Sequence, residues 1–384
     1  MSLILDEHRE YLSDRVRVDA FRKALRESLK PGDVVVDLGA GTGILGMLAC
    51  QAGAGRVYSI DEGAIVGLVR DVVRANGLDD RVTVLRGTST RVALAEPADV
   101  VVADQIGRFG FEAGILDCFA DAGRRFLKPD GRAIPSRIDL WIALVQESET
   151  WKHLQFWDRR PAGFSFEPAA AIARNTGYPV EFSRKNLLGG PLKVASLDTL
   201  THGSTRVAFT ASMEVERAGT MHGIGGWFVA QLSPGITMTN SPLASRRIHR
   251  RNVLFPIGRA VNVSRGDRVD VGFVILPHQV VVSWTVSISS NSKQGGRGRL
   301  KARFAHSTVN GMLISREDLS RTDPDGVPVL SRWGEARQTV LELCDGTRTL
   351  REVEAGVLRR HHDLFSTADD AAVFAAEVIT RYAR

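Results

Sequence analysis

Hydrophobic positions in the first third of the chain form short, nearly unbroken runs that are separated by glycine turns and helical stretches. The runs read VVVDLGAGTG, RVYSID, RVTVLRG and ADVVVAD. Strands that are buried on both faces of a parallel sheet have this Val/Ile-rich composition. Because helical stretches such as GILGMLACQAG lie between the runs, the pattern predicts an α/β domain with a parallel sheet.

After Pro135 the hydrophobic positions alternate with polar ones. The alternating segments read DLWIALVQ, RVAFTASMEV, RVDVGFVIL and VVVSWTVSIS, and Gly, Pro and Ser turns separate them. A period of two is typical of strands with one buried and one solvated face. This part of the chain, to about residue 310, is therefore predicted to form an antiparallel β domain.

A third pattern begins near Asp323, where PDG marks a turn. The segments that follow read ARQTVLELCDG, TLREVEAGVLRRH and TADDAAVFAAEVITRYAR, and each has hydrophobic positions at helical spacing. Residues 323–384 are predicted to form a small helical module.

The composition is that of a soluble globular protein with two or three domains, because 43% of the 384 residues are hydrophobic and 24% are charged. No apolar run is long enough for a membrane span, and MSLILDEHREYL does not have the pattern of a signal peptide, so we expect a cytoplasmic protein without membrane partners. Cys50, Cys118 and Cys344 are far apart in sequence. They are expected to be buried free thiols, with no disulfide and no metal site.

The net charge of +6 comes mostly from arginine, which clusters at residues 246–251 and again between Lys293 and Arg303. Aromatic side chains are not interleaved with these charges, so a solvated face is favoured over a nucleic-acid groove. An acidic peptide partner would fit the same charges.

A glycine-rich turn, DLGAGTG, follows the first predicted strand and precedes a helix. It contains Asp37, Gly39, Gly41 and Gly43, and such glycines let the backbone approach a ligand closely at a helix N-terminus. Asp61 closes the next strand, where a carboxylate can accept hydrogen bonds from both hydroxyls of a ribose. Together these features predict a nucleoside cofactor. The GxGxG spacing differs from the GxGxxG spacing of nicotinamide enzymes and disfavours an oxidoreductase.

Several ordered blocks resemble the protein arginine methyltransferases. The resemblance runs from about residue 8 to 290 and rests on HREYLSDRVRVDAF, VVVDLGAGTGILGMLACQAGAGRVYSID, RFLKPDGRAIPSRIDLWIA, MHGIGGWFVAQL and IHRRNVLFPIGRAVNVSRGDRVDVGFVIL. It implies a Rossmann-like domain over residues 1–135 that binds S-adenosylmethionine and releases S-adenosylhomocysteine. It also implies a β-barrel substrate domain over residues 136–315, with a helical arm at about 151–190 that mediates a homodimer.

The resemblance also implies roles for individual residues. Arg17 would pair with the carboxylate of the cofactor, and Asp61 would hold its ribose. His249 stands where the family carries a Thr-His-Trp loop, and its family partner corresponds to Asp14. An Asp–His pair of this kind could orient a substrate or relay a proton. Without the resemblance, Arg17 could instead be a surface ion-pair residue, and His249 would more often be an ordinary polar turn residue.

The family's catalytic hairpin, with two glutamates that bind a guanidinium, corresponds here to ADQIGRFGFEAG. Asp104 falls on the first glutamate and Glu112 approximately on the second. The first acid is one methylene shorter, the segment is one residue shorter, and Gln105 replaces an aromatic residue. Two carboxylates could still localise a cationic nucleophile or remove its proton.

Two further departures concern the cofactor. The segment RGTSTRV has no acidic residue to contact the adenine, so Thr88 and Ser89 are expected to contribute hydroxyl groups. The segment before His8 is too short for the aromatic helix that covers the cofactor in the family, and a more open cofactor site is expected.

The segment ARQTVLELCDGTRTLREVEAGVLRRHHDLF resembles the helical part of leader-peptide-recognition domains of enzymes that modify ribosomally made peptides. A helical cap that only buries apolar surface explains it equally well.

From these observations we expect a methyltransferase that modifies a nitrogen of a peptide or protein side chain, with arginine as the favoured acceptor and peptide natural products as a candidate context. A methyltransferase of free amines is the first alternative. A non-catalytic cofactor-binding scaffold is the second, and the presence of both Asp104 and Glu112 weighs against it.

Overall fold

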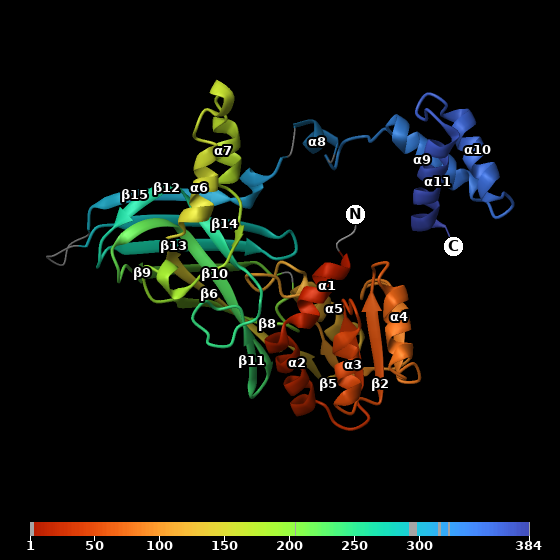
Figure 1. The fold of residues 1–384 in the computed structure, drawn as a ribbon, viewed down its shortest axis with the longest axis horizontal. Coiled ribbons are helices and arrows are strands. Elements are labelled where there is room, and N and C mark those ends of the chain that lie inside the picture. The colour runs from red at the N-terminus through yellow and green to blue at the C-terminus, as the bar shows by residue number, and fades with distance from the viewer. Residues whose placement is uncertain (1–3, 204, 292–297, 314–315, 322, 384) are drawn as a thin grey trace. The chain divides into compact units, whose positions relative to one another are not determined.

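The computed structural model describes residues 4–203, 205–291, 298–313, 316–321 and 323–383. The chain divides into two compact units, Met1–Met312 and Leu313–Arg384. The first unit contains one parallel sheet and two antiparallel sheets, and the second consists of helices joined by loops (Figure 1). The fold class predicted from the sequence, an α/β domain followed by an antiparallel β domain and a helical module, is confirmed.

The parallel sheet has five strands in the order β3-β2-β1-β4-β5, and all of its neighbouring pairs are parallel. The strands are β1 (Val34–Leu38), β2 (Arg56–Asp61), β3 (Val82–Arg86), β4 (Ala98–Val102) and β5 (Leu127–Ile134). All five residues of β1 are buried. This burial explains the unbroken hydrophobic run, because a central parallel strand is covered on both faces.

Five helices belong to this part of the chain: α1 (Ile4–Ser13), α2 (Arg15–Ser28), α3 (Ile44–Gln51), α4 (Val66–Ala75) and α5 (Ile115–Arg125). The side chain of Asp14 caps α2 by accepting a hydrogen bond from the backbone N–H of Arg17. Such a cap satisfies one of the donors that a helix leaves unpaired at its N-terminus. It fixes the start of α2 beside the carboxyl ends of the strands.

The strand order reverses between β1 and β4, so the segments that leave these two strands diverge. Ligands of open α/β sheets bind at this kind of switch point, outside the carboxyl ends of the strands. Asp37 pairs with Val102 in the sheet register. Gly39 and Asp104 each lie two residues farther along and therefore leave the sheet at the same level.

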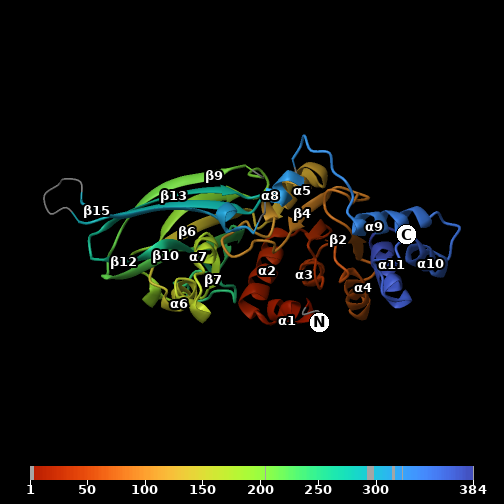
Figure 2. The ribbon, with the colours of Figure 1, turned by 90° about the horizontal axis from the view of Figure 1, so that it is seen from above.

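The antiparallel strands form two sheets, which Figure 2 shows as separate layers. One sheet has the order β7-β12-β10-β6-β8, with β11 paired to β10, and the other has the order β15-β14-β13-β9. Their bounds are β6 (Arg137–Val145), β7 (Tyr178–Val180), β8 (Leu192–Asp198), β9 (Val207–Glu214), β10 (Gly219–Ser233), β11 (Ile236–Thr239), β12 (Asn252–Val263), β13 (Arg268–Leu276), β14 (Val281–Ser289) and β15 (Leu300–Ser307). Burial alternates along β13, as the period-two pattern predicted.

The long strand β10 does not alternate, because both of its faces are covered along much of its length. It contains Gly223, Gly225 and Gly226, and a Cβ atom at Gly226 would lie 2.8 Å from the ring of Phe109. At Gly225 it would lie 2.8 Å from the ring of Phe182. These glycines allow the aromatic rings to pack directly on the strand backbone.

The predicted arm contains α6 (Ser148–Phe156) and α7 (Glu167–Ala173), which project from the sheets (Figure 1). Trp151 of α6 stacks on His222 of β10 with ring centroids 5.1 Å apart. The α-helices of the arm end before β7, which pairs with β12. Tyr178–Val180 of the range 151–190 therefore belongs to the sheet rather than to the arm, and a 3-10 helix at Arg184–Asn186 follows it.

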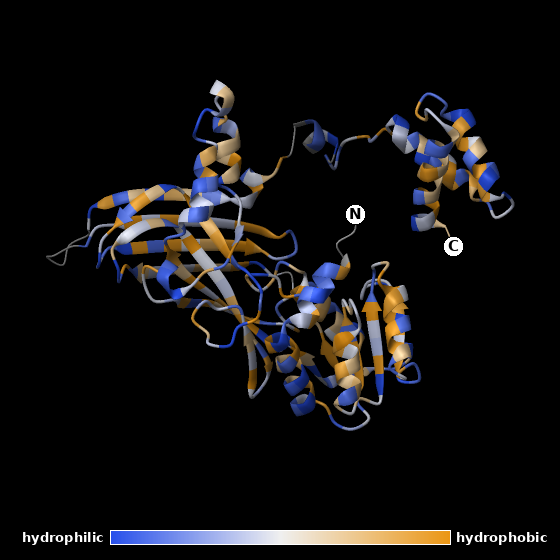
Figure 3. Ribbon diagram, viewed as in Figure 1, coloured by the Kyte–Doolittle hydropathy of each residue, from blue (hydrophilic) through white to orange (hydrophobic). Residues whose placement is uncertain are grey.

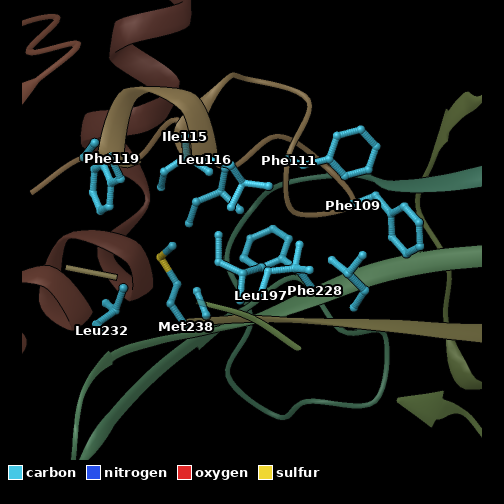
Figure 4. Packing of buried hydrophobic residues seen from close by; sticks show 14 of the residues in the cluster. Phe109, Phe111, Ile115, Leu116, Phe119, Leu197, Phe228, Leu232 and Met238 are labelled. Atoms are coloured by element: carbon cyan, nitrogen blue, oxygen red, sulfur yellow. The ribbon is translucent and has the colours of Figure 1, made fainter. Parts of the chain in front are cut away.

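One continuous hydrophobic cluster joins the parallel sheet to the antiparallel sheets. Figure 4 shows Phe109 and Phe111 of the loop after β4 packed near Phe228 of β10, and Ile115, Leu116 and Phe119 of α5 in the same cluster. Since the loop after β4 is buried between the two parts, its backbone is fixed by the core.

The second unit contains α8 (Arg316–Arg321), α9 (Arg332–Leu343), α10 (Leu350–Arg360) and α11 (Ala368–Tyr382). Helices α9 to α11 turn hydrophobic positions toward one another and have their own core (Figure 3). Thr349 and Thr367 form capping boxes with Glu352 and Asp370. Among the residues that the structure describes, no helix is long and apolar enough to cross a membrane.

Candidate active site

The glycine-rich turn leaves β1 in a left-handed backbone conformation. The φ angles of Gly39, Gly41 and Gly43 are 63°, 55° and 77°. Residues with a Cβ rarely adopt such values, so glycine is required at these positions. A Cβ on Gly39 would overlap the side chain of Gln105, and one on Gly41 would lie 2.7 Å from the imidazole ring of His8. The turn thus has the geometry that the sequence predicted.

Asp61 ends β2 directly beside this turn. Its Oδ2 accepts a hydrogen bond of 2.9 Å from the backbone N–H of Gly41, and its Oδ1 accepts one of 2.8 Å from that of Gly63. The side chain is only partly buried and lines a cavity. A carboxylate held in this way by two amides presents its remaining lone pairs to a ligand.

The cavity has a volume of about 320 Å³ and lies over the carboxyl ends of β1 and β2. Thr88 and Ser89, which the sequence predicted as adenine contacts, are part of its wall. Gln105 also lines the cavity, and its buried Oε1 has no hydrogen-bond partner among the described residues. An unpaired buried oxygen at the edge of a cavity is a ready acceptor for a polar ligand.

A larger cavity of about 680 Å³ lies between α5 and the turn after β8, away from the glycine loop.

Asp37 lies beneath the glycine turn rather than in the cavity wall. Its Oδ2 accepts a hydrogen bond of 2.9 Å from the backbone N–H of Gly46, in the first turn of α3. Its Oδ1 and the hydroxyl of Ser59 have no hydrogen-bond partner among the described residues. Burial raises the pKa of Asp37 to about 7. The structure therefore gives Asp37 a supporting position behind the predicted cofactor loop.

Asp104, the first acid of the hairpin, forms ion pairs with two arginines. Arg17 Nε bonds to its Oδ2, and Arg250 Nη2 lies 3.0 Å from the same oxygen. Burial works to raise the pKa of Asp104, but the adjacent guanidinium groups more than offset this and lower it. Arg17 also donates a hydrogen bond of 3.0 Å to the carbonyl of Tyr11. The arginine predicted to bind the cofactor carboxylate thus contacts Asp104 in this structure.

Glu112, the second acid of the hairpin, turns into its own loop. Its carboxylate accepts hydrogen bonds of 2.9–3.2 Å from the backbone N–H groups of Phe109, Gly110 and Phe111. Burial raises the pKa of Glu112 despite these bonds. The two carboxylates were expected to face a common nucleophile. They do not do so in this structure, because Glu112 of the shorter hairpin folds over Gly107.

Asp14 and His249 are in contact, but not through the imidazole ring. Asp14 Oδ2 accepts a hydrogen bond of 2.7 Å from the backbone N–H of His249. The side chain of His249 is exposed. The predicted Asp–His pair therefore links α2 to the loop before β12 through the backbone, since the carboxylate of Asp14 is shared with the cap of α2.

Sequence reasoning missed two residues of this site, Arg250 and Tyr11. Arg250 belongs to an arginine cluster that was expected to be solvated, yet its side chain is only 14% exposed. The ring of Tyr11 lies 4.8 Å from the guanidinium of Arg17 and 6.0 Å from that of Arg250. Tyr11 and His8 of α1 thus cover the site. The sequence did offer one signal for Arg250. It directly follows His249, at the position where the Thr-His-Trp loop of the family has Trp.

The remaining candidates for chemistry lie elsewhere. Cys50, Cys118 and Cys344 are free, and only Cys50 is fully buried. The described ranges contain no group of three or more His, Cys, Asp or Glu side chains that could hold a metal ion. Part of the second basic cluster, Lys293 to Arg297, lies outside the described residues.

Comparison with protein families gives two matches, which overlap at residues 136–146. Residues 22–146 match the model described as ribosomal protein L11 methyltransferase (PrmA). Residues 136–290 match the arginine methyltransferase oligomerization subdomain. The matches together extend from α2 to the end of β14.

Relatives in plants show similar sequences. The probable protein arginine N-methyltransferase 6 of Arabidopsis thaliana is 33% identical over 243 residues, and the match covers 59% of this chain and 54% of that relative. The chain thus spans about half the length of this relative. Protein arginine N-methyltransferase PRMT10 of the same plant is 27% identical over 306 residues, and the match covers 71% of this chain and 80% of that relative.

Solved structures share the fold. The structure of Arabidopsis thaliana protein arginine methyltransferase 10 in a uniquely open conformation matches with a TM-score of 0.69 and 24% identity, over 79% of this chain and 98% of that chain. The Trypanosoma brucei PRMT1 enzyme–prozyme heterotetrameric complex with AdoHcy matches with a TM-score of 0.67 and 19% identity, over 78% of this chain and 97% of that chain. The glycine turn, the acidic hairpin and these matches together support a protein arginine methyltransferase-like, S-adenosylmethionine-dependent methyltransferase.

Proposed function

We propose that this chain is an enzyme that transfers a methyl group from S-adenosylmethionine to a nitrogen of a peptide or protein side chain, and that arginine is the acceptor. One observation carries the proposal. The cavity beside Gly39 and Asp61 and the buried acid Asp104 lie at the same level of the sheet, and the side chain of Gln105 lies over Gly39 between them. In this proposal the nucleoside site and the acceptor site would adjoin.

The residues around the cavity fit the cofactor. Asp61 would hold the ribose hydroxyls, and the backbone and hydroxyl groups of Thr88 and Ser89 would contact the adenine. Arg17 would bind the carboxylate of the cofactor, and for this its guanidinium has NH groups beyond the one that bonds to Asp104. The cofactor supplies an electrophilic methyl group, and S-adenosylhomocysteine is the product.

The protein must also align the acceptor nitrogen and remove its proton. As the new N–C bond forms, the acceptor nitrogen loses a proton to a nearby base. Glu112 is the better candidate for this role, because the neighbouring arginines hold the pKa of Asp104 low. To accept the proton, the carboxylate of Glu112 would have to leave the hydrogen bonds that it makes to the backbone of its own loop. Asp104 then has an electrostatic and positioning role.

Transfer of tritiated methyl groups to synthetic peptides tests the proposal. A Gly-Arg-Gly repeat peptide should become labelled and yield methylarginine on acid hydrolysis, whereas the matching Gly-Lys-Gly peptide should not. Glu112→Gln should slow the reaction by about 10²-fold or more while the affinity for S-adenosylhomocysteine stays unchanged. Label in the lysine peptide only would refute the arginine acceptor, and no label in any protein or peptide would refute the enzyme.

A free amine is the second candidate acceptor. The ion pairs of Asp104 with Arg17 and Arg250 favour an amino group over a guanidinium as the acceptor, because they occupy the carboxylate that would bind a guanidinium. Free arginine and agmatine, assayed beside the peptide, separate the two candidates: faster turnover of the small amines would assign a small-molecule methyltransferase.

We also propose that the arm mediates self-association. Phe156, Phe164 and Phe166 are 46%, 68% and 39% exposed, and such a group of large apolar side chains is typical of an interface. Phe164→Ser should shift the mass measured by light scattering toward the monomer. Val373→Ser on α11, which changes a side chain that is 71% exposed, is the matched control and should leave the mass unchanged.

The helical module is proposed to bind a segment of the substrate, as a leader-recognition module of peptide-modifying enzymes would. The support is the exposed apolar segment before α9, where Val327 and Val329 are 90% and 88% exposed. No strand is assigned in the described part of residues 313–383, so a docking mode by strand addition has no partner edge there. Val329→Ser should raise KM for an extended substrate and leave kcat and the KM of a short Gly-Arg-Gly peptide unchanged. Equal KM values for wild type and variant would refute this role.

A further inference from the structure

Two guanidinium groups converge on one buried carboxylate beside the cofactor loop. Arg17 comes from α2 and Arg250 from the loop before β12, and both contact Asp104. The side chains of Asp104 and Arg250 are only 5% and 14% exposed. This contact is therefore part of the interior of the site and is not a flexible surface ion pair.

Arg250 binds Asp104 with both ends of its guanidinium. Its Nη1 donates to Oδ1 at 3.2 Å and its Nη2 donates to Oδ2 at 3.0 Å. Such two-point binding is the arrangement by which a carboxylate recognises a guanidinium. Arg17 also donates to Oδ2. An external guanidinium that approaches Asp104 therefore finds both carboxylate oxygens already engaged.

Glu112, the other acid of the hairpin, is not free to bind the external guanidinium in place of Asp104. Both oxygens of Glu112 accept hydrogen bonds from backbone N–H groups of their own loop. Within this buried group the charges of Arg17 and Arg250 balance those of Asp104 and Glu112 when both acids are ionised. A third cation would leave an unbalanced positive charge in a poorly solvated place, which is costly.

We propose that Arg250 is a specificity-determining residue: its guanidinium occupies the place on Asp104 that a guanidinium acceptor would take, so that an arginine acceptor binds only by displacing it. The inference rests on the proposed function, because it concerns the acceptor half of the same site. Arg250 acts as an internal competitor for arginine and lowers the preference of the enzyme for cationic over neutral acceptors.

The test compares two synthetic peptides that differ only in charge, a Gly-Arg-Gly peptide and the same peptide with citrulline in place of arginine. Their dissociation constants are measured with wild type, Arg250→Ala and Arg251→Ala in the presence of saturating S-adenosylhomocysteine. Arg251 is the matched control, because it is the next residue, carries the same charge and is exposed, with no side-chain hydrogen bond or ion pair to another described residue. Arg250→Gln is a second variant that removes the charge but keeps a polar side chain, in case Arg250→Ala folds poorly.

Removal of Arg250 should raise the preference for arginine over citrulline by about tenfold or more, since a charge-assisted pair with Asp104 becomes available. Arg250→Gln should shift the preference in the same direction, and Arg251→Ala should leave it unchanged. An unchanged preference in both Arg250 variants, or an equal change in Arg251→Ala, would overturn the proposal. Failure of wild type to bind S-adenosylhomocysteine would instead refute the proposed function, so the two failures are distinguishable.

Discussion

The two halves of the proposed site, a cofactor half and an acceptor half, are built in different ways. The cofactor half is built from backbone: three glycines in left-handed conformation and a carboxylate that two amides hold beside an open cavity. The acceptor half is built from side chains of distant segments, and Asp104 is already paired with Arg17 and Arg250. One half has space for a ligand, whereas the other has its charges satisfied internally.

Substitutions in the two halves are therefore expected to differ in their effects on binding and on folding stability. Groups that line a cavity are partly solvated, so their loss affects binding more than folding. Buried charges that pair with each other are coupled to the fold, because removal of one partner leaves the others uncompensated. The comparison therefore predicts large stability effects in the acceptor half and small ones in the cofactor half.

The largest effect is expected for Asp104→Ala. The substitution leaves the guanidinium groups of Arg17 and Arg250 buried without a carboxylate, and should lower the free energy of unfolding by about 3–5 kcal/mol. Urea titration followed by circular dichroism measures the loss.

Glu181→Ala is the control for this substitution, because Glu181 also pairs with an arginine, Arg247, but its side chain is 74% exposed. That variant should lose less than about 1 kcal/mol. Equal losses in the two variants would contradict the distinction between a buried and a solvated pair.

A smaller effect is expected at Asp37 and depends on pH. Its pKa is raised by burial from 3.8 to about 7 in the folded state, so the folded protein retains a proton that the unfolded chain releases. This contribution to stability is fully present below pH 4 and is lost as pH rises to about 7. Asp37→Asn removes the titration. Its stability relative to wild type should therefore increase by roughly 2 kcal/mol between pH 5 and pH 8.

Urea titrations of both proteins at several pH values measure this difference, and other titrating groups cancel in it. A difference that stays constant across pH 5 to 8 would show that Asp37 is not the titrating group.

The smallest effect on stability is expected for glycine-to-alanine substitutions, which should differ between the cofactor turn and an ordinary helix position. Gly39→Ala should cost about 1–2 kcal/mol, because φ is 63° and the new Cβ would overlap Gln105. Gly67→Ala is the matched control, since Gly67 lies in α4 with no atom within 4 Å of the added Cβ. It should stabilise the protein by about 0.5 kcal/mol. Thermal unfolding of both variants checks the opposite signs.

Sequence patterns predicted the cofactor half because its determinants are local. The turn after β1 follows from the spacing of Gly39, Gly41 and Gly43, and Asp61 follows from the end of the next hydrophobic run. The parallel sheet and β13 were equally readable, because hydrophobic periodicity reports burial directly.

The arrangement of the acceptor half could not be predicted from local sequence patterns. Arg250 and Asp104 are 146 residues apart, and no local pattern distinguishes a buried arginine from the exposed Arg251 beside it. The direction of Glu112 is set by hydrogen bonds within a loop whose length departs from the family pattern. Strand β10 likewise lacks the period-two pattern, because both of its faces are buried along much of its length.

Calorimetric titration with S-adenosylhomocysteine tests the central claim, that the cofactor half is prepared independently of the acceptor half. Wild type should bind, and Asp61→Ala should weaken binding by about 1.5–3 kcal/mol, the usual contribution of hydrogen bonds to a charged group. Arg250→Ala should weaken binding less than Asp61→Ala does, because Arg250 lies outside the cavity and is linked to the cofactor half only through Asp104 and Arg17. No binding by wild type, or equal losses in the two variants, would contradict the account.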